Sequence, residues 1–340
     1  MHKDNCFDTA RLVAALMVMF AHQSVLSGLD EPSIFGFGGI SGTAVAIFFS
    51  ISGFLVSRSA MRSDNFIVFM GKRVRRIFPA LIPCAIFMYV IVGGIVNDWN
   101  TRYLLSGDIV TNIIKTIYFI PVTNDGISSA FKHPGLNGSL WTLPLEFMCY
   151  LFVSVFVSIW KDKRVFILLF IISFIAAIFF QLSNYKVSIF YIPAWLFPLR
   201  AMAFFFGAIL AMYIDAWNRI DIKLPLAVCL TLFMYTTMSF TLEYSVIRYI
   251  VISFLTISVC VSFGDPLVKG RFDYSYGIYI YAFPIQQLVI NYTYLGVYSG
   301  LVLTACITLL MASLSWHFVE SRFVTRSNLS KVTAQPEVLP

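Results

Sequence analysis

Charged side chains are scarce in this 340-residue sequence. Asp, Glu, Lys and Arg make up 12% of it, against roughly 25% in a soluble domain. So few polar groups cannot cover a surface that faces water, whereas they suffice for a surface that faces lipid. Hydrophobic residues make up 59% and the mean hydropathy is +0.82, which excludes a soluble globular protein. An aromatic share of 17% excludes intrinsic disorder.

Disulfide and metal patterns are also lacking. The six cysteines are scattered, none forms a C-x-x-C pair, and the four histidines show no ligand spacing. We expect no metal and no disulfide framework, with the cysteines acting as small core residues. The formal charge of +7 does not indicate a nucleic-acid partner, because the basic residues lie between hydrophobic runs.

Ten hydrophobic stretches predict an all-α polytopic membrane protein. A spanning helix needs about 20 mostly apolar residues. The first stretch has no clear small-x-small cleavage site after it, so we expect a retained helix and not a signal peptide. The expected helices cover residues 8–29, 34–57, 77–97, 139–160, 165–182, 192–214, 222–241, 245–263, 274–296 and 299–320.

The basic residues predict the orientation. With the N-terminus inside, 18 of the 24 Lys and Arg fall on the inner side, and this bias favours an N-in, C-in protein. We expect a transmembrane domain over residues 1–323, a short cytoplasmic tail over 324–340, and a long outer segment near 98–138 whose apolar part, 113–122, lies at the interface. The basic residues expected outside are Arg102, Lys115, Lys132, Lys186, Arg200 and Arg248.

Ionisable residues inside spanning helices are costly and mark candidate functional sites. Arg11 and His22 lie eleven residues apart, which places them on one helix face about 16 Å apart along the axis. Counting along the helices, Glu146 falls at a similar depth to His22. A carboxylate beside an imidazole is the arrangement that orients a general base. The alternative is that Arg11 reaches the inner headgroups and His22 is a hydrogen-bonded core residue.

Arg200 falls in the same layer of the membrane. It either neutralises Glu146, which we slightly favour, or binds an anionic or developing oxyanion group. Aromatic and hydroxyl side chains near this layer are candidates for substrate contacts, although tryptophans at helix ends are commonly interface anchors. These further candidates are Ser139, Trp141, Tyr276 and Tyr279.

A basic cluster precedes Pro79, where we expect the third helix to begin on the inner side. It contains Lys72, Arg73, Arg75 and Arg76. Such clusters usually reflect inner-side topology or anionic lipid. The functional alternative is a phosphate site, since the arginine fork binds phosphate oxygens bidentately.

Several sequence blocks together resemble the membrane acyltransferase-3 family, which includes bacterial O-antigen and other glycan O-acetyltransferases. The resemblance runs from about residue 7 to 323. The blocks, in the family's order, are Arg11 and His22 as R-x10-H, FFSISGF at 48–54, RVRRIFP at 73–79, SLWTLPLE at 139–146, SYGIYIYAFP at 275–284 and SWHFVE at 315–320. One departure is Ala282, where the family usually has a histidine before Phe-Pro.

The resemblance implies a transferase that moves an acyl group, commonly acetyl, from cytoplasmic acyl-coenzyme A to a sugar hydroxyl of a lipid-linked or surface glycan. It implies a multi-pass protein of the bacterial inner membrane, of the form without an esterase-like domain. His22 and Glu146 would be catalytic. Arg11, Arg73 and Arg76 would bind the donor, acetyl-CoA.

Two other function classes would also place charges in the membrane. One is a transporter or flippase of lipid-linked sugars, and the other is a membrane glycan polymerase. A transporter should show inverted repeats or paired broken helices, and the sequence shows no clear repeat. Release of coenzyme A would separate an acyltransferase from both.

Overall fold

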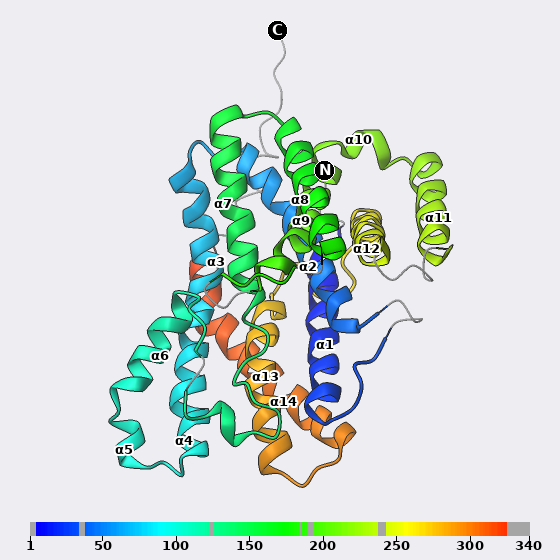
Figure 1. The fold of residues 1–340 in the computed structure, drawn as a ribbon. Helices are drawn as coiled ribbons and strands as arrows, with labels where there is room; N and C mark the ends of the chain where they lie inside the picture. Colours follow the sequence, from blue (N-terminus) through cyan, green and yellow to red (C-terminus); the bar gives the residue numbers. More distant parts are fainter. Residues whose placement is uncertain are drawn as a thin grey trace.

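The computed structural model describes residues 5–33, 38–122, 125–183, 185–189, 193–236 and 243–324. These residues form helices and no β-strand (Figure 1). The long helices, in chain order, are α1 (Phe7–Leu26), α2 (Ile40–Met61), α3 (Phe66–Ile86), α7 (Thr142–Trp160), α8 (Arg164–Ser183), α9 (Phe197–Met212), α11 (Ile220–Thr236), α12 (Glu243–Ser262), α13 (Ser275–Tyr292) and α14 (Val297–Ser315).

The shorter helical pieces extend or join the long ones. The π-helix η1 (Phe87–Val92) and α4 (Gly93–Val96) continue α3, and η4 (Trp316–Glu320) continues α14. The others are α5 (Thr101–Leu104), α6 (Gly107–Ile117), η2 (Ser128–Ala130), η3 (Ala194–Leu196), α10 (Ile214–Trp217) and α15 (Ser321–Phe323).

The structure confirms an all-α polytopic membrane protein. Among the described residues, seven helical stretches are long and apolar enough to cross a membrane. Many apolar side chains on them are exposed, as lipid-facing surfaces require; on α8 alone these include Ile172, Ile175 and Phe179. Each of the ten expected ranges overlaps a helix, but α11, α12 and α13 fall short of the seven in described length or hydropathy. Residues 34–37, 192 and 237–241 of the expected ranges, and 325–340 of the expected tail, lie outside the described residues. The count of ten spans and their orientation stay predictions.

The pair α2 and α9 forms the centre of the bundle. A Cβ added to Gly53 of α2 would lie 1.8 Å from the carbonyl oxygen of Phe204, and one added to Gly207 of α9 would lie 2.1 Å from that of Ser50. The two backbones therefore touch, and only glycine fits at the two contact points. This contact explains the glycine in the FFSISGF block.

The third helix begins eleven residues before the expected position. α3 starts at Phe66, where the Asn65 side chain accepts a hydrogen bond of 2.9 Å from the amide of Val68. The basic cluster therefore lies within the helix and not in a loop before it, and Pro79 and Pro83 are inside the same helix. The expected start was wrong because the charges interrupt the hydropathy signal.

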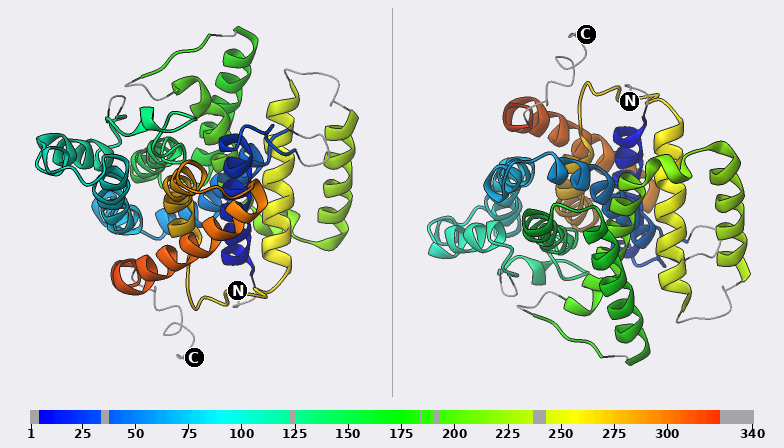
Figure 2. Two further views of the ribbon diagram at one scale, coloured as in Figure 1. Left: turned by 90° about the horizontal axis from the view of Figure 1, so that it is seen from below. Right: turned by 90° about the horizontal axis from the view of Figure 1, so that it is seen from above.

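Two parts of the chain lie at opposite edges of the bundle. Figure 2 shows α11 at one edge beside α12, and α5 with α6 at the other. α5 and α6 occupy the end of the molecule where α1 ends and α14 begins (Figure 1). α6 is the helical form of the apolar outer piece expected at 113–122, and it starts and ends earlier in the chain.

Candidate functional site

Two of the predicted arginines share one carboxylate, that of Asp273 just before α13. The Arg76 guanidinium donates a hydrogen bond of 2.5 Å to Asp273 Oδ2, and Arg11 Nη1 lies 3.5 Å from the same oxygen. Asp273 Oδ1 accepts from the amide and hydroxyl of Ser275 at the start of α13. Burial raises the pKa of Asp273, but Arg76 and Arg11 lower it more, so its net shift is downward. The ion pairs tie α1, α3 and α13 together.

Arg73 lies one turn before Arg76 on α3 and has a different environment. Its guanidinium carbon is 5.7 Å from the ring centroid of Phe69 and 5.9 Å from that of Tyr150. Among the described residues it forms no ion pair within 4.0 Å, and its buried Nε has no hydrogen-bond partner. Arg73 is therefore a half-buried cation that is free to bind an anion.

Glu146 belongs to this arginine region. Its Oε1 accepts hydrogen bonds of 2.5 Å from the hydroxyls of Ser52 on α2 and Tyr150 on α7. No hydrogen bond or ion pair between described residues joins Glu146 to His22 or to Arg200, so neither expected pairing is present. The reason is visible in Figure 1: α7 begins midway through the molecule and runs away from the end that α1 approaches.

His22 lies near the other end of α1. Its ring packs edge-on against Phe283 of α13, with 5.1 Å between the ring centroids. Its Nδ1 is buried and has no hydrogen-bond partner among the described residues. The neighbouring Gln23 accepts a hydrogen bond of 3.1 Å from buried Gln286, which also donates to the carbonyl of Met19 at 2.7 Å. These amide contacts fix α1 against α13 beside the imidazole.

Between the two ends lies a group of hydroxyls that includes two predicted residues. Tyr279 donates to the backbone carbonyl of Ser139 at 2.9 Å, and its hydroxyl lies 2.5 Å from that of Thr142. The Ser139 hydroxyl is buried without a partner among the described residues. A buried, unpaired hydroxyl is costly in an apolar interior unless a ligand group pairs with it.

Arg200 is held between two aromatic rings. Its guanidinium carbon lies 5.3 Å from the ring centroid of Trp141 and 5.6 Å from that of Tyr249. The residue is 8% exposed, and its Nε has no hydrogen-bond partner among the described residues. The other predicted aromatic residue, Tyr276, instead lies at the arginine region, 6.0 Å from the Arg76 guanidinium carbon.

Sequence reasoning missed several residues that complete the arginine region. Ser52 and Glu320 are inside the resembling blocks, and Tyr150 follows Glu146 by one helical turn, so each was within reach of pattern analysis. Glu320 is 1% exposed, accepts a hydrogen bond of 2.8 Å from Ser315, and leaves its second oxygen without a partner among the described residues. Asp273 lies two residues before the SYGIYIYAFP block, and no sequence pattern distinguished it from other aspartates.

Comparison with known proteins places this site in a family. The family model described as an acyltransferase domain, acyltransferase-3, matches residues 4–320. The chain belongs to the acyltransferase-3 family. It is therefore an acyltransferase, and its helices make it a multi-pass membrane protein.

Relatives within the curated proteins agree with this assignment. The chain is 50% identical to the O-acetyl transferase of Shigella phage Sf6, covering 96% of this chain and 98% of that one. It is 28% identical to nodulation protein 10 of Rhizobium leguminosarum bv. viciae, covering 94% and 92%. No solved structure matches. Among the described residues there is also no group of three or more His, Cys, Asp or Glu that could hold a metal.

Proposed function

We propose that this acyltransferase moves an acetyl group from cytoplasmic acetyl-CoA to a hydroxyl of a lipid-linked or surface glycan, such as O-antigen. The similarity to the phage O-acetyl transferase supports acetyl as the group and oxygen as its destination. On this proposal the protein lies in the bacterial inner membrane and modifies lipopolysaccharide or a related surface polymer. The excess of basic residues on one side supports an N-in, C-in orientation.

The observation that carries the proposal is the gathering of Arg11, Arg73 and Arg76 at the inner end of the bundle. Coenzyme A is polyanionic, and guanidinium groups bind phosphate oxygens bidentately. Asp273 contacts Arg11 and Arg76, and Asp8 lies 3.8 Å from Arg11, whereas no described carboxylate lies within 4.0 Å of Arg73, so Arg73 is the cation left for the donor. The nucleotide end of the donor would bind here, with membrane lipids around the bundle.

His22 is the proposed general base. A hydroxyl becomes a good nucleophile when a base takes its proton as the new bond forms. In the overall balance the sugar oxygen gains the acetyl group, the thioester C–S bond breaks, and coenzyme A leaves as the thiol. Arg11 and His22 lie about 16 Å apart along one face of α1, so the extended arm of the donor would cover the interval between them.

The proposed role of Glu146 is to support the reaction from the arginine region without touching His22. It holds Tyr150, whose ring lies beside Arg73, and so orients the donor-binding cation. Ser139, Trp141, Arg200 and Tyr279 lie between the two ends, where the carbonyl oxygen needs a hydrogen-bond donor as it gains negative charge. Tyr276 would help to place Arg76.

Coenzyme A release by purified protein in liposomes tests the proposal against a transporter or flippase. The wild-type protein should release coenzyme A from acetyl-CoA when unmodified glycan from cells that lack the gene is added. The Arg73→Ala variant should release much less. If glycan crosses the membrane while acetyl-CoA stays intact, the protein is a transporter and the proposal fails.

A further inference from the structure

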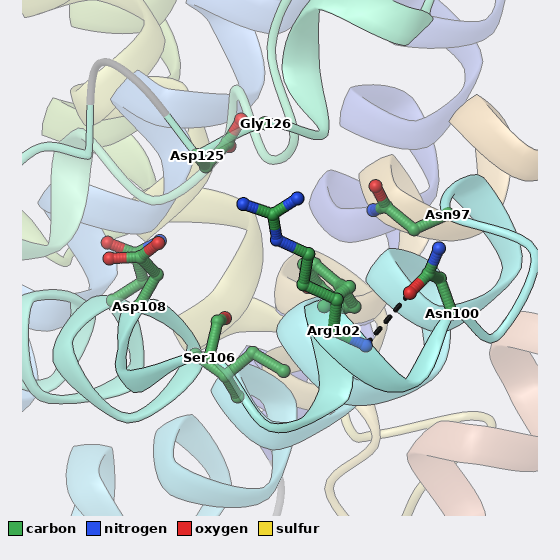
Figure 3. A pocket seen from close by; sticks show the side chains of 10 residues that line it. Asn97, Asn100, Arg102, Ser106, Asp108, Asp125 and Gly126 are labelled. Atoms are coloured by element: carbon green, nitrogen blue, oxygen red, sulfur yellow. Dashed lines mark hydrogen bonds between the residues drawn. The ribbon is translucent and has the colours of Figure 1, made fainter.

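A polar cleft of about 460 Å³ lies outside the helix bundle (Figure 3). It opens between the end of α4, the short helices α5 and α6, and residues 125–126. Under the proposed orientation this is the outer side of the membrane, the end of the molecule where α1 ends and α14 begins (Figure 1). Nothing in the acyl-transfer site described above uses these residues.

The cleft presents a buried hydrogen-bonding group that has no partner among the described residues. Asn112 of α6 lines it and is 6% exposed as a residue. The Ser106 hydroxyl is buried and unpaired within the described chain. A buried hydroxyl without a partner is costly, so Ser106 itself indicates a ligand, and the Asn112 amide that lines the same cleft is available to bind it.

The remaining polar side chains are held in place and still present free atoms. Asn97 donates through its side-chain nitrogen to the carbonyl of Gly93, and Asn100 accepts through its side-chain oxygen from the amide of Arg102. The side-chain oxygen of Asn97 and the side-chain nitrogen of Asn100 therefore remain for a ligand. The guanidinium of Arg102 points into the middle of the cleft in Figure 3, and it makes no ion pair within 4.0 Å with any described residue.

The chemistry of this lining selects the class of ligand. Two carboxylates, Asp108 and Asp125, face one cation, so a phosphorylated or otherwise anionic ligand would be repelled. Most of the lining residues carry polar side chains, and apolar atoms share the lining with them, as suits a sugar ring with its polar hydroxyls and apolar C–H faces. Hydroxyl groups both donate and accept hydrogen bonds, and a sugar ring carries several of them. Carboxylates would accept from such hydroxyls, while Arg102 and Asn112 would donate to them.

A single segment connects the cleft to His22. It starts at Asp125 in the cleft and passes along α13, where Gln287 donates hydrogen bonds of 2.8 and 2.6 Å to two of its carbonyls. It then brings Gly138 so close to Phe283 that an added Cβ would lie 2.5 Å from that ring. Phe283 is the ring against which His22 packs. The segment that lines the cleft therefore also contacts the ring that packs against the proposed base.

We propose that this cleft binds a saccharide unit of the acceptor glycan, next to the unit that is acetylated. The proposal rests on the proposed function for the identity of the polymer. It makes the α5–α6 segment a determinant of acceptor affinity and not of acetyl-CoA binding.

Saturation-transfer NMR on the detergent-solubilised protein tests binding without any turnover. The probes are methyl glycosides of a hexose, a 6-deoxyhexose and an N-acetylhexosamine. Wild type should transfer saturation to at least one probe, and Arg102→Ala and Asn112→Leu should each lose most of the signal, because one charged or buried hydrogen-bonding group is worth about tenfold in affinity. Thr111→Val, on the exposed side of α6, is the matched control and should behave as wild type.

Enzyme kinetics separate this inference from the proposed function. Arg102→Ala should raise the KM for glycan about tenfold or more while the KM for acetyl-CoA stays unchanged. Arg102 is exposed, so its loss should not affect folding even if Asn112→Leu does. If wild type binds none of the probes, or if the variants bind them as wild type does, the cleft is not a saccharide site, whatever the result for coenzyme A release.

Discussion

Arg73 and Arg76 lie one turn apart on α3, and their surroundings give them different tasks. Arg76 is bound to Asp273, so it carries part of the structure that joins α3 to α13. Arg73 lies against the rings of Phe69 and Tyr150 and makes no ion pair within 4.0 Å among the described residues. The two arginines belong to one basic cluster in the sequence, but they have different roles. Separate measurements of donor binding and of stability distinguish these roles.

We expect Arg73→Ala to weaken acetyl-CoA binding by about 10- to 100-fold, the value of a lost charge-assisted hydrogen bond, with little change in melting temperature. Arg76→Ala should weaken binding and also lower the melting temperature, because Asp273 loses its nearer partner. Arg73→Lys should restore little, since the bidentate fork is lost. Calorimetric titration and thermal unfolding in detergent measure both. If the variant with both Arg73 and Arg76 changed to Ala binds acetyl-CoA normally, the basic cluster only marks the inner side of the membrane and does not bind the donor.

Asp273 gives this region a defined pH dependence. Because the net shift of its pKa is below the ordinary value of 3.8, its ion pairs contribute stability that is complete above about pH 4–5 and is lost as the pH falls through the lower, folded-state pKa. The difference in melting temperature between wild type and Asp273→Asn should therefore be constant from pH 8 to pH 5. A difference that already disappears near pH 6 would contradict the ionised state of Asp273.

At the scale of elements, the contact between α2 and α9 sets how closely the bundle packs. Gly53 and Gly207 each face a backbone carbonyl of the other helix, so neither position has room for a methyl group. Gly71 of α3 is different, since nothing lies within 4 Å of an added Cβ. The three glycines therefore form a natural comparison.

We expect Gly53→Ala and Gly207→Ala to destabilise the protein by roughly 1–3 kcal/mol or more through overpacking, with loss of monodisperse protein in size-exclusion chromatography. Gly71→Ala should be neutral or stabilising by about 0.5–1 kcal/mol, the helix preference of alanine over glycine. Equal behaviour of all three variants would show that the close approach of α2 and α9 is not what holds the bundle.

Hydrophobic runs predicted which segments form helices, and failed where a helix carries charge. The start of α3 was missed because Lys72 to Arg76 looks like a loop, although Asn65 caps a helix that contains it. In the structure Tyr279 contacts Ser139, and Arg200 contacts Trp141. The sequence had placed these residues only in a similar layer of the membrane. The predicted approach of Glu146 to His22 is absent, because counting along a helix gives no depth when the helix starts midway through the bundle, as α7 does.

At the scale of the whole molecule, the proposed orientation rests on the distribution of basic residues. The end with α5, α6 and the saccharide cleft should face outward, and the end with the arginine region should face the cytoplasm. This arrangement would place donor and acceptor on opposite sides of the membrane, with His22 accessible to the acceptor and the arm of the donor crossing between them.

Reporter fusions test this orientation directly. Fusions near Lys115 and Lys186 should give the signal of an external reporter, and fusions near Asn65 and Asp162 should give that of a cytoplasmic one. A cytoplasmic signal at Lys115 would place the cleft on the same side as the arginine region, and the proposed separation of donor and acceptor would be wrong.

The identity of His22 as the base that activates a glycan hydroxyl is best tested on the product itself. Surface glycan from cells that express wild type, His22→Gln or His22→Ala can be analysed by mass spectrometry for added acetyl groups, with protein levels matched. Removal of a positioned base typically costs about 10²–10⁴-fold in rate, so wild type should acetylate the glycan and both variants should leave it unmodified. If His22→Gln, which keeps hydrogen-bonding capacity, still acetylates the glycan at close to the wild-type level, His22 is a core residue and not the base.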